Sequence, residues 1–342
     1  MTSLPFVPSP RLRVALTGPF GAPVQALPWM DRFLEPDELR LVGVLAAGPL
    51  TLPAAAAAIA TAGGRHVGPS FFDRCERRAV IDRPTPESVA LADFAERLDV
   101  WSMFEGWKDV PDDVRATLAA WRLERYVGEK RPQVERLLVG DAPEVGIENA
   151  EYLLLAEAEA VIGRAEHVYL WPCDCRALLG RCRKPSAVCL RFDNDRGLGW
   201  EISRERAVEV LRQADAAGLM HTGELTPAEG HEGTTTIGSG AICNCCADCC
   251  FPHLAGEALD AVKVWPRARY VARRDPDACT LCGRCARRCP FGAFVAGREG
   301  GRIASMAFDQ ALCRGCGLCA TGCRDEAVAM LPLDQAADRE LA

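Results

Sequence analysis

The chain has 342 residues, of which 49% are hydrophobic, so it is long enough for two or three domains with a sizeable buried core. Its formal net charge of −7 argues against a protein that coats nucleic acid, because such proteins carry a basic surface. Eighteen cysteines in a chain of intracellular character predict metal ligands rather than a disulfide framework.

The apolar segments indicate the expected cellular location of the protein. The first residues lack a charged region followed by an apolar core, so no signal peptide is expected. No apolar stretch approaches the roughly 20 residues that a membrane span needs. The alanine-rich run at 54–60 is too short. We therefore expect no membrane span and a cytoplasmic location.

The first third of the chain predicts a helical module after a short lead-in. Residues 1–30 are rich in Pro and Gly, which favours an extended lead-in. Apolar residues then recur at helical spacing from Phe33 to Leu45. A short link at 48–53 precedes an alanine-rich helix, and a third helix runs from about Gly68 to Arg77. A strand is expected after it.

This order of elements resembles a winged helix-turn-helix domain over residues 31–85. The resemblance implies that the third helix would read DNA, which draws attention to nearby arginines. These are Arg65, Arg74, Arg77 and Arg78. Residues 1–100 nevertheless carry 10 Arg against 11 Asp plus Glu, whereas a DNA reader usually shows a basic face. We therefore favour a packing or docking module, and we expect Cys75 to be a buried apolar residue.

Residues 86–150 predict a helical region rich in tryptophan, and 151–162 predict a further helix. An aromatic stripe at this spacing usually belongs to the core. The sequence shows no dinucleotide fingerprint, phosphate-binding loop or serine-hydrolase elbow. No nucleotide or flavin site is therefore predicted.

The region 151–262 carries so many cysteines that it predicts a metal-binding domain. They are Cys173, Cys175, Cys182, Cys189, Cys243, Cys245, Cys246, Cys249 and Cys250. His221 and His253 lie near them in sequence. A folded domain does not need nine cysteines for packing, and soft thiolates at this density select iron–sulfur clusters or zinc.

The number of cysteines leaves several occupants open. Two [4Fe-4S] clusters would use eight of the nine, and one cluster would leave five, enough for a zinc site. We favour at least one further iron–sulfur cluster, with zinc alone as the alternative. Cys173 and Cys175 must meet the segment 243–250 in space, because neither segment supplies a comfortable set of four ligands.

The region 263–342 carries two runs of the form C-x2-C-x2-C-x3-C. The first is Cys279, Cys282, Cys285 and Cys289, and the second is Cys313, Cys316, Cys319 and Cys323. This is the ligand spacing of a cubane [4Fe-4S] cluster. Zinc usually takes separated pairs, and a disulfide framework fits a small secreted domain. The sequence therefore predicts two clusters here.

The spacing also predicts which cysteines share a cluster. Three thiolates on one tight loop reach three corners of a cube, while the fourth points away and reaches the other cube. One set is then Cys279, Cys282, Cys285 and Cys323, and the other is Cys313, Cys316, Cys319 and Cys289. Gly283 and Gly317 lie inside the loops, where a positive φ is favoured because the backbone passes close to sulfide.

Residues 268–333 resemble the bacterial dicluster ferredoxins, since short apolar segments flank both loops as the strands of that family's βαβ repeat would. The chain departs from the family at Arg324, where proline often follows, and in the polar hairpin at 297–301. The resemblance implies an α+β protein. Its N-terminal and middle regions would be mostly helical, with a C-terminal ferredoxin-like dicluster domain built from βαβ repeats.

Residues 150–330 as a whole resemble prokaryotic 4Fe-4S ferredoxin-fusion proteins. The shared elements are Cys173–Arg176, Cys189-Leu190, Glu201–Ala207, Gly218–His221 and Cys243–Cys246. The resemblance implies iron–sulfur cofactors and gives no substrate.

These patterns favour an iron–sulfur electron-transfer protein that relays electrons to or within a redox enzyme system through partner proteins. One alternative is an iron–sulfur oxidoreductase whose chemistry occurs at the middle cysteines, with an open iron position or with His221 as a ligand. The other is a redox-sensing winged-helix transcription regulator. No catalytic base stands out, and the missing basic face counts against the regulator.

Overall fold

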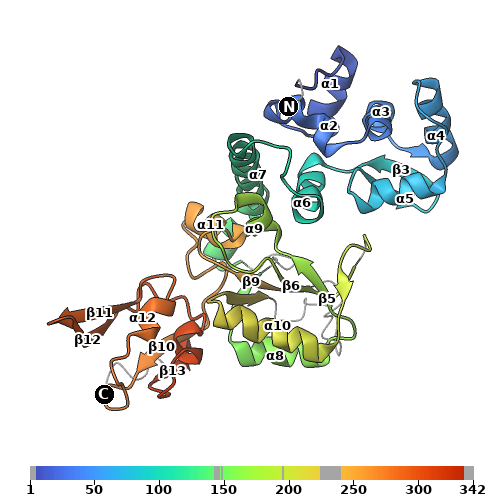
Figure 1. The fold of residues 1–342 in the computed structure, drawn as a ribbon. Coiled ribbons are helices and arrows are strands. Elements are labelled where there is room, and N and C mark those ends of the chain that lie inside the picture. The colour runs from blue at the N-terminus through green and yellow to red at the C-terminus, as the bar shows by residue number, and fades with distance from the viewer. Residues whose placement is uncertain (1–4, 142–146, 148, 195, 224–239, 335–342) are drawn as a thin grey trace. The chain divides into compact units, whose positions relative to one another are not determined.

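The computed structural model describes residues 5–141, 147, 149–194, 196–223 and 240–334. They combine helices with small sheets, as an α+β protein does (Figure 1). The chain divides into two compact units. The first unit is Met1–Arg125 with the short segments Ala177–Leu179 and Asp195–Leu198, and the second holds the remaining residues.

The first unit is mostly helical and contains one small sheet. Its helices are α1 (Pro10–Thr17), the 3-10 helix η1 (Val24–Trp29), α2 (Met30–Phe33), α3 (Pro36–Leu45), α4 (Leu52–Thr61), α5 (Pro69–Arg77) and α6 (Phe94–Phe104). Its strands are β1 (Leu50–Thr51), β2 (Ile81–Thr85) and β3 (Ser88–Leu91). The long helix α7 (Asp112–Leu138) crosses the boundary between the units.

The lead-in expected to be extended is helical instead. Ser9 caps α1 by accepting a hydrogen bond from the Leu12 amide at 3.3 Å, and Pro10 occupies the first helical position. Both residues are favoured at helix starts, because a cap satisfies a free N–H and proline has none. The high proline content therefore marks the start of a helix here.

The order α3, β1, α4, α5, β2, β3 follows from local signals. Glu35 and Glu38 form a capping box at the start of α3, and Thr51 caps α4. The three strands form an antiparallel sheet in the order β1-β3-β2.

A buried network of charged side chains joins the helices of this unit. Glu38 and Arg97 are fully buried. Arg78 contacts Glu38 at 2.8 Å and Glu105 at 2.9 Å, and Arg97 contacts Glu105 at 2.8 Å. Burial raises the pKa of Glu38, and Arg78 counteracts this by favouring the charged form. The network satisfies charges that would otherwise be costly to bury.

The middle of the second unit is built on a six-stranded antiparallel sheet, so the expectation of a mostly helical middle region was wrong. The order of strands is β4-β8-β9-β6-β5-β7. They are β4 (Glu151–Leu153), β5 (Tyr169–Pro172), β6 (Ala187–Arg191), β7 (Trp200–Glu201), β8 (Met220–Gly223) and β9 (Ala241–Cys245). Each strand is short, and the helical pattern of the segments between them dominates the sequence.

Helices α8 (Leu155–Arg164) and α10 (Arg204–Ala216) lie side by side on one face of this sheet (Figure 1). The short helices α9 (Asp174–Leu179) and α11 (Phe251–Ala258) follow β5 and β9. The helix expected over 151–162 begins only at Leu155, because Tyr152 and Leu153 are buried as strand residues.

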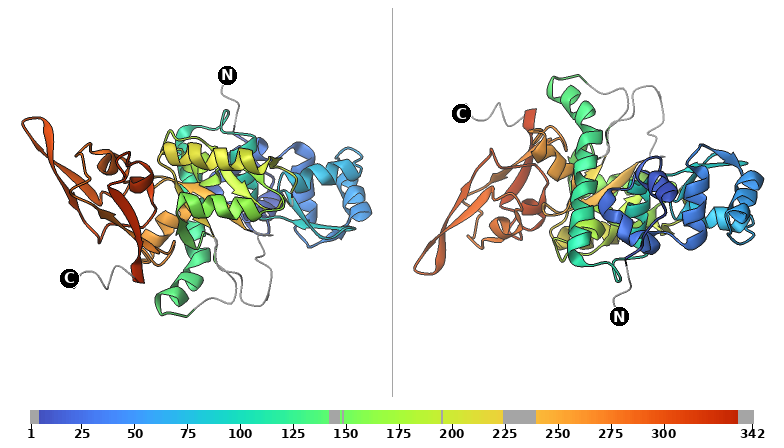
Figure 2. Two further views of the ribbon diagram at one scale, coloured as in Figure 1. Left: turned by 90° about the horizontal axis from the view of Figure 1, so that it is seen from below. Right: turned by 90° about the horizontal axis from the view of Figure 1, so that it is seen from above.

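The last part of the second unit contains two strand pairs and two short helices. The antiparallel pairs are β10 (Tyr270–Arg274) with β13 (Val328–Pro332) and β11 (Phe294–Glu299) with β12 (Arg302–Phe308). The helices are α12 (Arg284–Arg288) and α13 (Leu318–Thr321). The β11–β12 hairpin extends away from the rest of this region (Figure 2). Within the described residues, no helix has both the length and the apolarity to cross a membrane.

We predict that Arg78→Ala lowers the free energy of unfolding of the first unit by about 3 kcal/mol, because it leaves Glu38 buried without its direct ionic partner. Urea unfolding followed by tryptophan fluorescence measures this. The control is Arg77→Ala at the exposed neighbouring position, which should change stability by less than about 0.5 kcal/mol. Equal stabilities of the two variants would show that the buried network contributes nothing.

Candidate metal centres

Neighbouring strands of the middle sheet bring distant cysteines together. Cys189 lies in β6, Cys243 and Cys245 lie in β9, and Cys173 directly follows β5. These strands are adjacent in the order β9-β6-β5, and their register places Trp171 opposite Cys189. The antiparallel pairing therefore gathers thiols from segments that are far apart in the chain.

Two helix starts add further cysteines to the same place. Cys173 and Cys250 occupy the N-cap positions of α9 and α11. The amide of Phe251 donates a hydrogen bond to Cys175 Sγ at 3.3 Å, so the first turns of the two helices touch. The segments that sequence reasoning expected to meet in space do meet.

Six of the nine middle cysteines form a continuous group, which we call the six-cysteine cluster. Its members are Cys173, Cys175, Cys189, Cys243, Cys245 and Cys250. Hydrogen bonds between thiols link neighbouring members in the order 175-173-189-243-245-250. Every member is buried or half-buried.

This environment disfavours free thiolates. The hydrogen bond to Cys173 and burial both raise the pKa of Cys175 well above the ordinary value of a thiol. A metal bound by this group would have to displace its protons, and the positive charge of the metal would stabilise the thiolates.

The remaining three cysteines form a second group, which we call the three-cysteine cluster. The Sγ atoms of Cys182, Cys246 and Cys249 all lie within 4.8 Å of one another. The Sγ atoms of Cys246 and Cys182 are 3.6 Å apart. The hydrogen bond from Cys249 outweighs burial and, with the one from Cys182, lowers the pKa of Cys246 to about 5.

Arg176 lies between the two clusters. Its side chain is buried and donates to the carbonyl oxygens of Asn244, at 2.9 Å, and Pro185. Burial opposes its charge, but thiolates of both clusters, including Cys173 and Cys246, raise its pKa. The sequence showed this arginine only as the last letter of C-x-C-R and gave no sign of its role.

The two histidines near the middle cysteines have other partners. His221 pairs in register with Asn244, whose side-chain oxygen lies 2.6 Å from His221 Nδ1. Side chains alternate along a strand, so His221 and Asn244 face away from the side that carries Cys243 and Cys245. His253 packs on the ring of Phe291, with the centroids 5.3 Å apart. The direction of the His221 side chain counts against this residue as a ligand of the six-cysteine cluster, and its Nε2 atom is buried without a hydrogen-bond partner among the described residues.

Cys75 is a fully buried residue of α5 in the core of the first unit. Burial, reinforced by the charge of Glu38, raises the pKa of its thiol. It belongs to neither cysteine cluster, as expected for a packing residue.

The eight C-terminal cysteines lie around two loops. The pKa of Cys285 is raised by burial and by the nearby Cys279 and Cys282, so the first loop gathers these three. Cys282 is exposed. Cys313, Cys316 and Cys319 of the second loop line one cavity together with Cys289, the last cysteine of the first run. Burial, with the charges of Cys289 and Cys313, raises the pKa of Cys316 to about 12.

The positive φ expected for both loop glycines is confirmed. Gly283 has φ of 71° and Gly317 has φ of 81°. A Cβ at Gly317 would lie 2.9 Å from Leu154 Cδ2, and one at Gly283 would meet Ile303. These positions therefore require glycine for conformation and for space.

The middle sheet and the second C-terminal loop share one apolar core. Tyr152, Met220, Cys245, Cys250 and Leu318 are its buried members, and Cys316 and Phe291 pack against it. Burial raises the pKa of Tyr152, and its thiol neighbours Cys250, Cys316 and Cys245 reinforce the rise. Sequence reasoning placed Tyr152 in a helix, and a three-residue strand carries no periodicity that could have corrected this.

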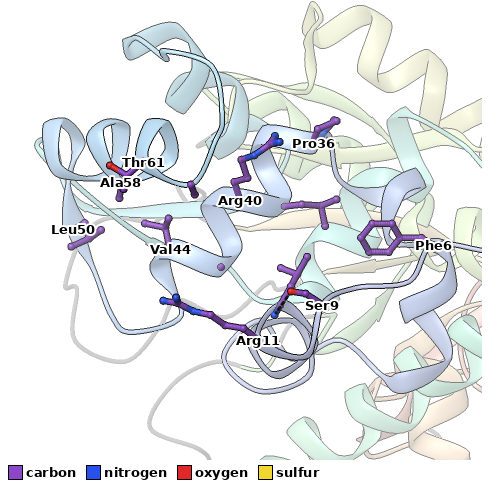
Figure 3. A pocket seen from close by; sticks show the side chains of 13 residues that line it. Phe6, Ser9, Arg11, Pro36, Arg40, Val44, Leu50, Ala58 and Thr61 are labelled. Carbon is purple, nitrogen blue, oxygen red and sulfur yellow. Dashed lines mark hydrogen bonds between the residues drawn. The ribbon is translucent and has the colours of Figure 1, made fainter.

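An apolar groove of about 840 Å³ lies in the first unit, between α1, α3 and α4 (Figure 3). Phe6, Leu39 and Val44 contribute apolar lining. Its polar groups are engaged locally, since Ser9 caps α1 and Arg40 contacts Asp37 at 3.0 Å. The thirteen described lining residues include no cysteine, histidine or carboxylate, so they offer no metal ligand.

Comparison with protein families identifies one segment of the chain. Residues 272–295, which include the first C-terminal cysteine run, match the Fer4 family, a 4Fe-4S binding domain. Searches against curated proteins and against solved structures give no match. The match and the cysteine clusters together identify an iron–sulfur protein of the electron-transfer type.

Proposed function

We propose that the chain is an electron relay in which two C-terminal [4Fe-4S] clusters lead to a third cluster held by the middle sheet. The observation that carries this proposal is the shared core around Tyr152, which brings Cys316 of the second C-terminal loop together with Cys245 and Cys250 of the middle region. Two redox centres that both contact the same buried side chains would be close enough to exchange electrons directly.

The C-terminal region would be a dicluster ferredoxin domain with cross-ligated clusters. Cys279, Cys282, Cys285 and Cys323 would bind the first cluster, and Cys313, Cys316, Cys319 and Cys289 the second. The cavity ringed by Cys289 and the second loop supports the second assignment. The pKa effects of Cys289 on Cys316 and Cys319 support it too.

The third cluster would be bound by four thiolates of the six-cysteine cluster. Iron–sulfur chemistry suits this group better than a disulfide network, because all six members are free thiols that lie together. Zinc is the alternative occupant.

The relay would have one end at the surface and one inside. Cys282 is exposed, so the first cluster is the one that a redox partner protein can approach. The second cluster is buried beside the middle sheet. Electrons would then pass from partner to first, second and third cluster, or in reverse. Eighteen free cysteines favour the reducing cytoplasm as the compartment.

A second candidate function is an iron–sulfur oxidoreductase with chemistry at the middle site. It is favoured by the two thiols of the six-cysteine cluster that a single cubane leaves unused. Substrate turnover that requires these thiols would distinguish it from a pure relay.

We propose that residues 31–85 form a winged-helix-like module with a packing or docking role. The order of elements and the β1-β3-β2 sheet support the fold. Three of the four arginines that drew attention are paired with carboxylates of α3 or of its N-cap residue. Arg65 contacts Asp37, Arg74 contacts Glu35, and Arg78 contacts Glu38. Because Arg65 and Arg74 remain exposed, the main argument against a DNA-binding face is the near balance of charge, 10 Arg against 11 Asp plus Glu over residues 1–100.

The C-terminal segment 262–342, produced alone and reconstituted without oxygen, should hold about eight irons and eight sulfides. Iron and sulfide analysis measures this directly. A content near four irons, or zinc in their place, would contradict two cross-ligated clusters.

Removing a ligand of the middle cluster should lower the iron content of the full chain by about four, with the C-terminal eight retained. Cys243→Ser and Cys175→Ser test this, and Cys75→Ser, a buried thiol in the other unit, is the control and should lose nothing. In EPR of the fully reduced parent, adjacent centres should broaden each other's signals. The ligand variants should lose the signal of the third cluster and its coupling to the second, and should keep the coupling between the two C-terminal clusters. Ligand variants with the full iron content and signal of the parent would refute the third cluster.

The first unit should not bind DNA tightly at physiological salt, because residues 1–100 carry 10 Arg against 11 Asp plus Glu and phosphate contacts dominate such affinity. A gel-shift titration with promoter DNA from the protein's own genetic neighbourhood, repeated at several salt concentrations, checks this. Sub-micromolar binding would favour the regulator instead.

A further inference from the structure

The three-cysteine cluster is too compact for a cubane. We propose that Cys182, Cys246 and Cys249 bind a single zinc ion and leave its fourth coordination position open to an external ligand. This site goes beyond the proposed relay, because it uses none of the twelve thiolates that three cubanes would take.

The distances between sulfur atoms indicate a mononuclear site. Sulfurs bound at about 2.3 Å to one tetrahedral ion lie about 3.8 Å apart. The Cys246–Cys182 separation is 3.6 Å, and all three Sγ atoms lie within 4.8 Å. Each ligand of a cubane binds a different iron, which keeps the thiolates farther apart. Among the described residues, no other three cysteines come this close together, since the second such group, Cys173, Asp174 and Cys175, contains only two cysteines.

The backbone around the site supports thiolate ligands. Cys246 and Cys249 are separated by two residues, which is the spacing of a zinc-binding pair. The amide of Cys249 donates a hydrogen bond to Cys246 Sγ, and the amide of Arg181 donates one to Cys249 Sγ. Such N–H donors orient metal ligands and offset their negative charge.

The charge of the site is balanced by Arg176. A zinc ion with three thiolates carries one net negative charge. The guanidinium of Arg176 is 5% exposed and acts on both Cys182 and Cys246. Its Nε atom is buried without a hydrogen-bond partner among the described residues. An anionic metal site beside it would compensate the buried cation.

The fourth position has no protein ligand within the described part of the chain. No other cysteine, histidine, aspartate or glutamate there brings a ligand atom within the same 4.8 Å group. Although His253 feels the charge of Cys246, its ring packs on Phe291 and its Nε2 lies 3.4 Å from Glu257. Cys182 is only half-buried. The site therefore resembles zinc centres with three protein ligands and one exchangeable position, which water or a small thiol can occupy.

The test uses the full chain, purified without oxygen and without added thiols, with zinc, iron and sulfide measured on each sample. The parent should contain one zinc per chain. Cys182→Ser and Cys246→Ser should lose this zinc and keep the parent's iron and sulfide, and Cys75→Ser should keep all three. Loss of about four irons from either variant, or a parent without zinc, would overturn the proposal.

A second measurement tests the open position and does not depend on a variant that folds. Protein produced with Co²⁺ in place of zinc should show the intense visible absorption of a tetrahedral thiolate-bound ion, as a difference from the same parent protein that contains zinc. Addition of 2-mercaptoethanol should shift these bands, because the thiol replaces the fourth ligand. Bands that do not respond would show that the protein itself fills the fourth position, contrary to the proposal.

Discussion

The antiparallel register of β5, β6 and β9 is the constraint that brings the cysteines of the middle region together. It places Cys189 and Cys243 on adjacent strands with Cys173 directly after the next strand, β5, and the helix starts that follow β5 and β9 add Cys175 and Cys250. A slip of one residue in any of these pairings would turn the cysteines to the opposite face. Helices α8 and α10, packed on that opposite face, hold the register through burial of their apolar sides.

The two faces of the same sheet carry different kinds of polar side chain. Cys243 and Cys245 point to one side, and His221 with Asn244 points to the other. Asn244 also donates to the Val188 carbonyl at 2.5 Å and accepts from Arg176 through its own carbonyl. One residue therefore connects the histidine, the neighbouring strand and the cation between the two cysteine clusters, so these parts of the middle region are coupled mechanically.

The sequence predicts best what is encoded locally. The C-terminal loops are such a case, because their spacing and the glycines Gly283 and Gly317 act within a few residues. The division of the nine middle cysteines into six and three could not be predicted, since it depends on strand register between distant segments. The position of Tyr152 in a strand could not be predicted, because a three-residue strand directly before a helix is too short to show an alternating hydrophobic pattern. Proline is common both in extended segments and at helix starts. The proline-rich start of the chain therefore predicts an extended segment, whereas in the structure Pro10 is the first residue of α1.

The core around Tyr152 also bears on how the protein matures. Leu318 and Cys316, from residues 263–342, pack in one core with the buried Cys245 and Cys250. If the middle thiols bind a cluster as proposed, iron and sulfide reach them most easily before residues 263–342 have packed. The middle cysteines also leave the ribosome before the two C-terminal loops during synthesis. The architecture would then favour loading of the proposed middle cluster before the two proposed C-terminal clusters.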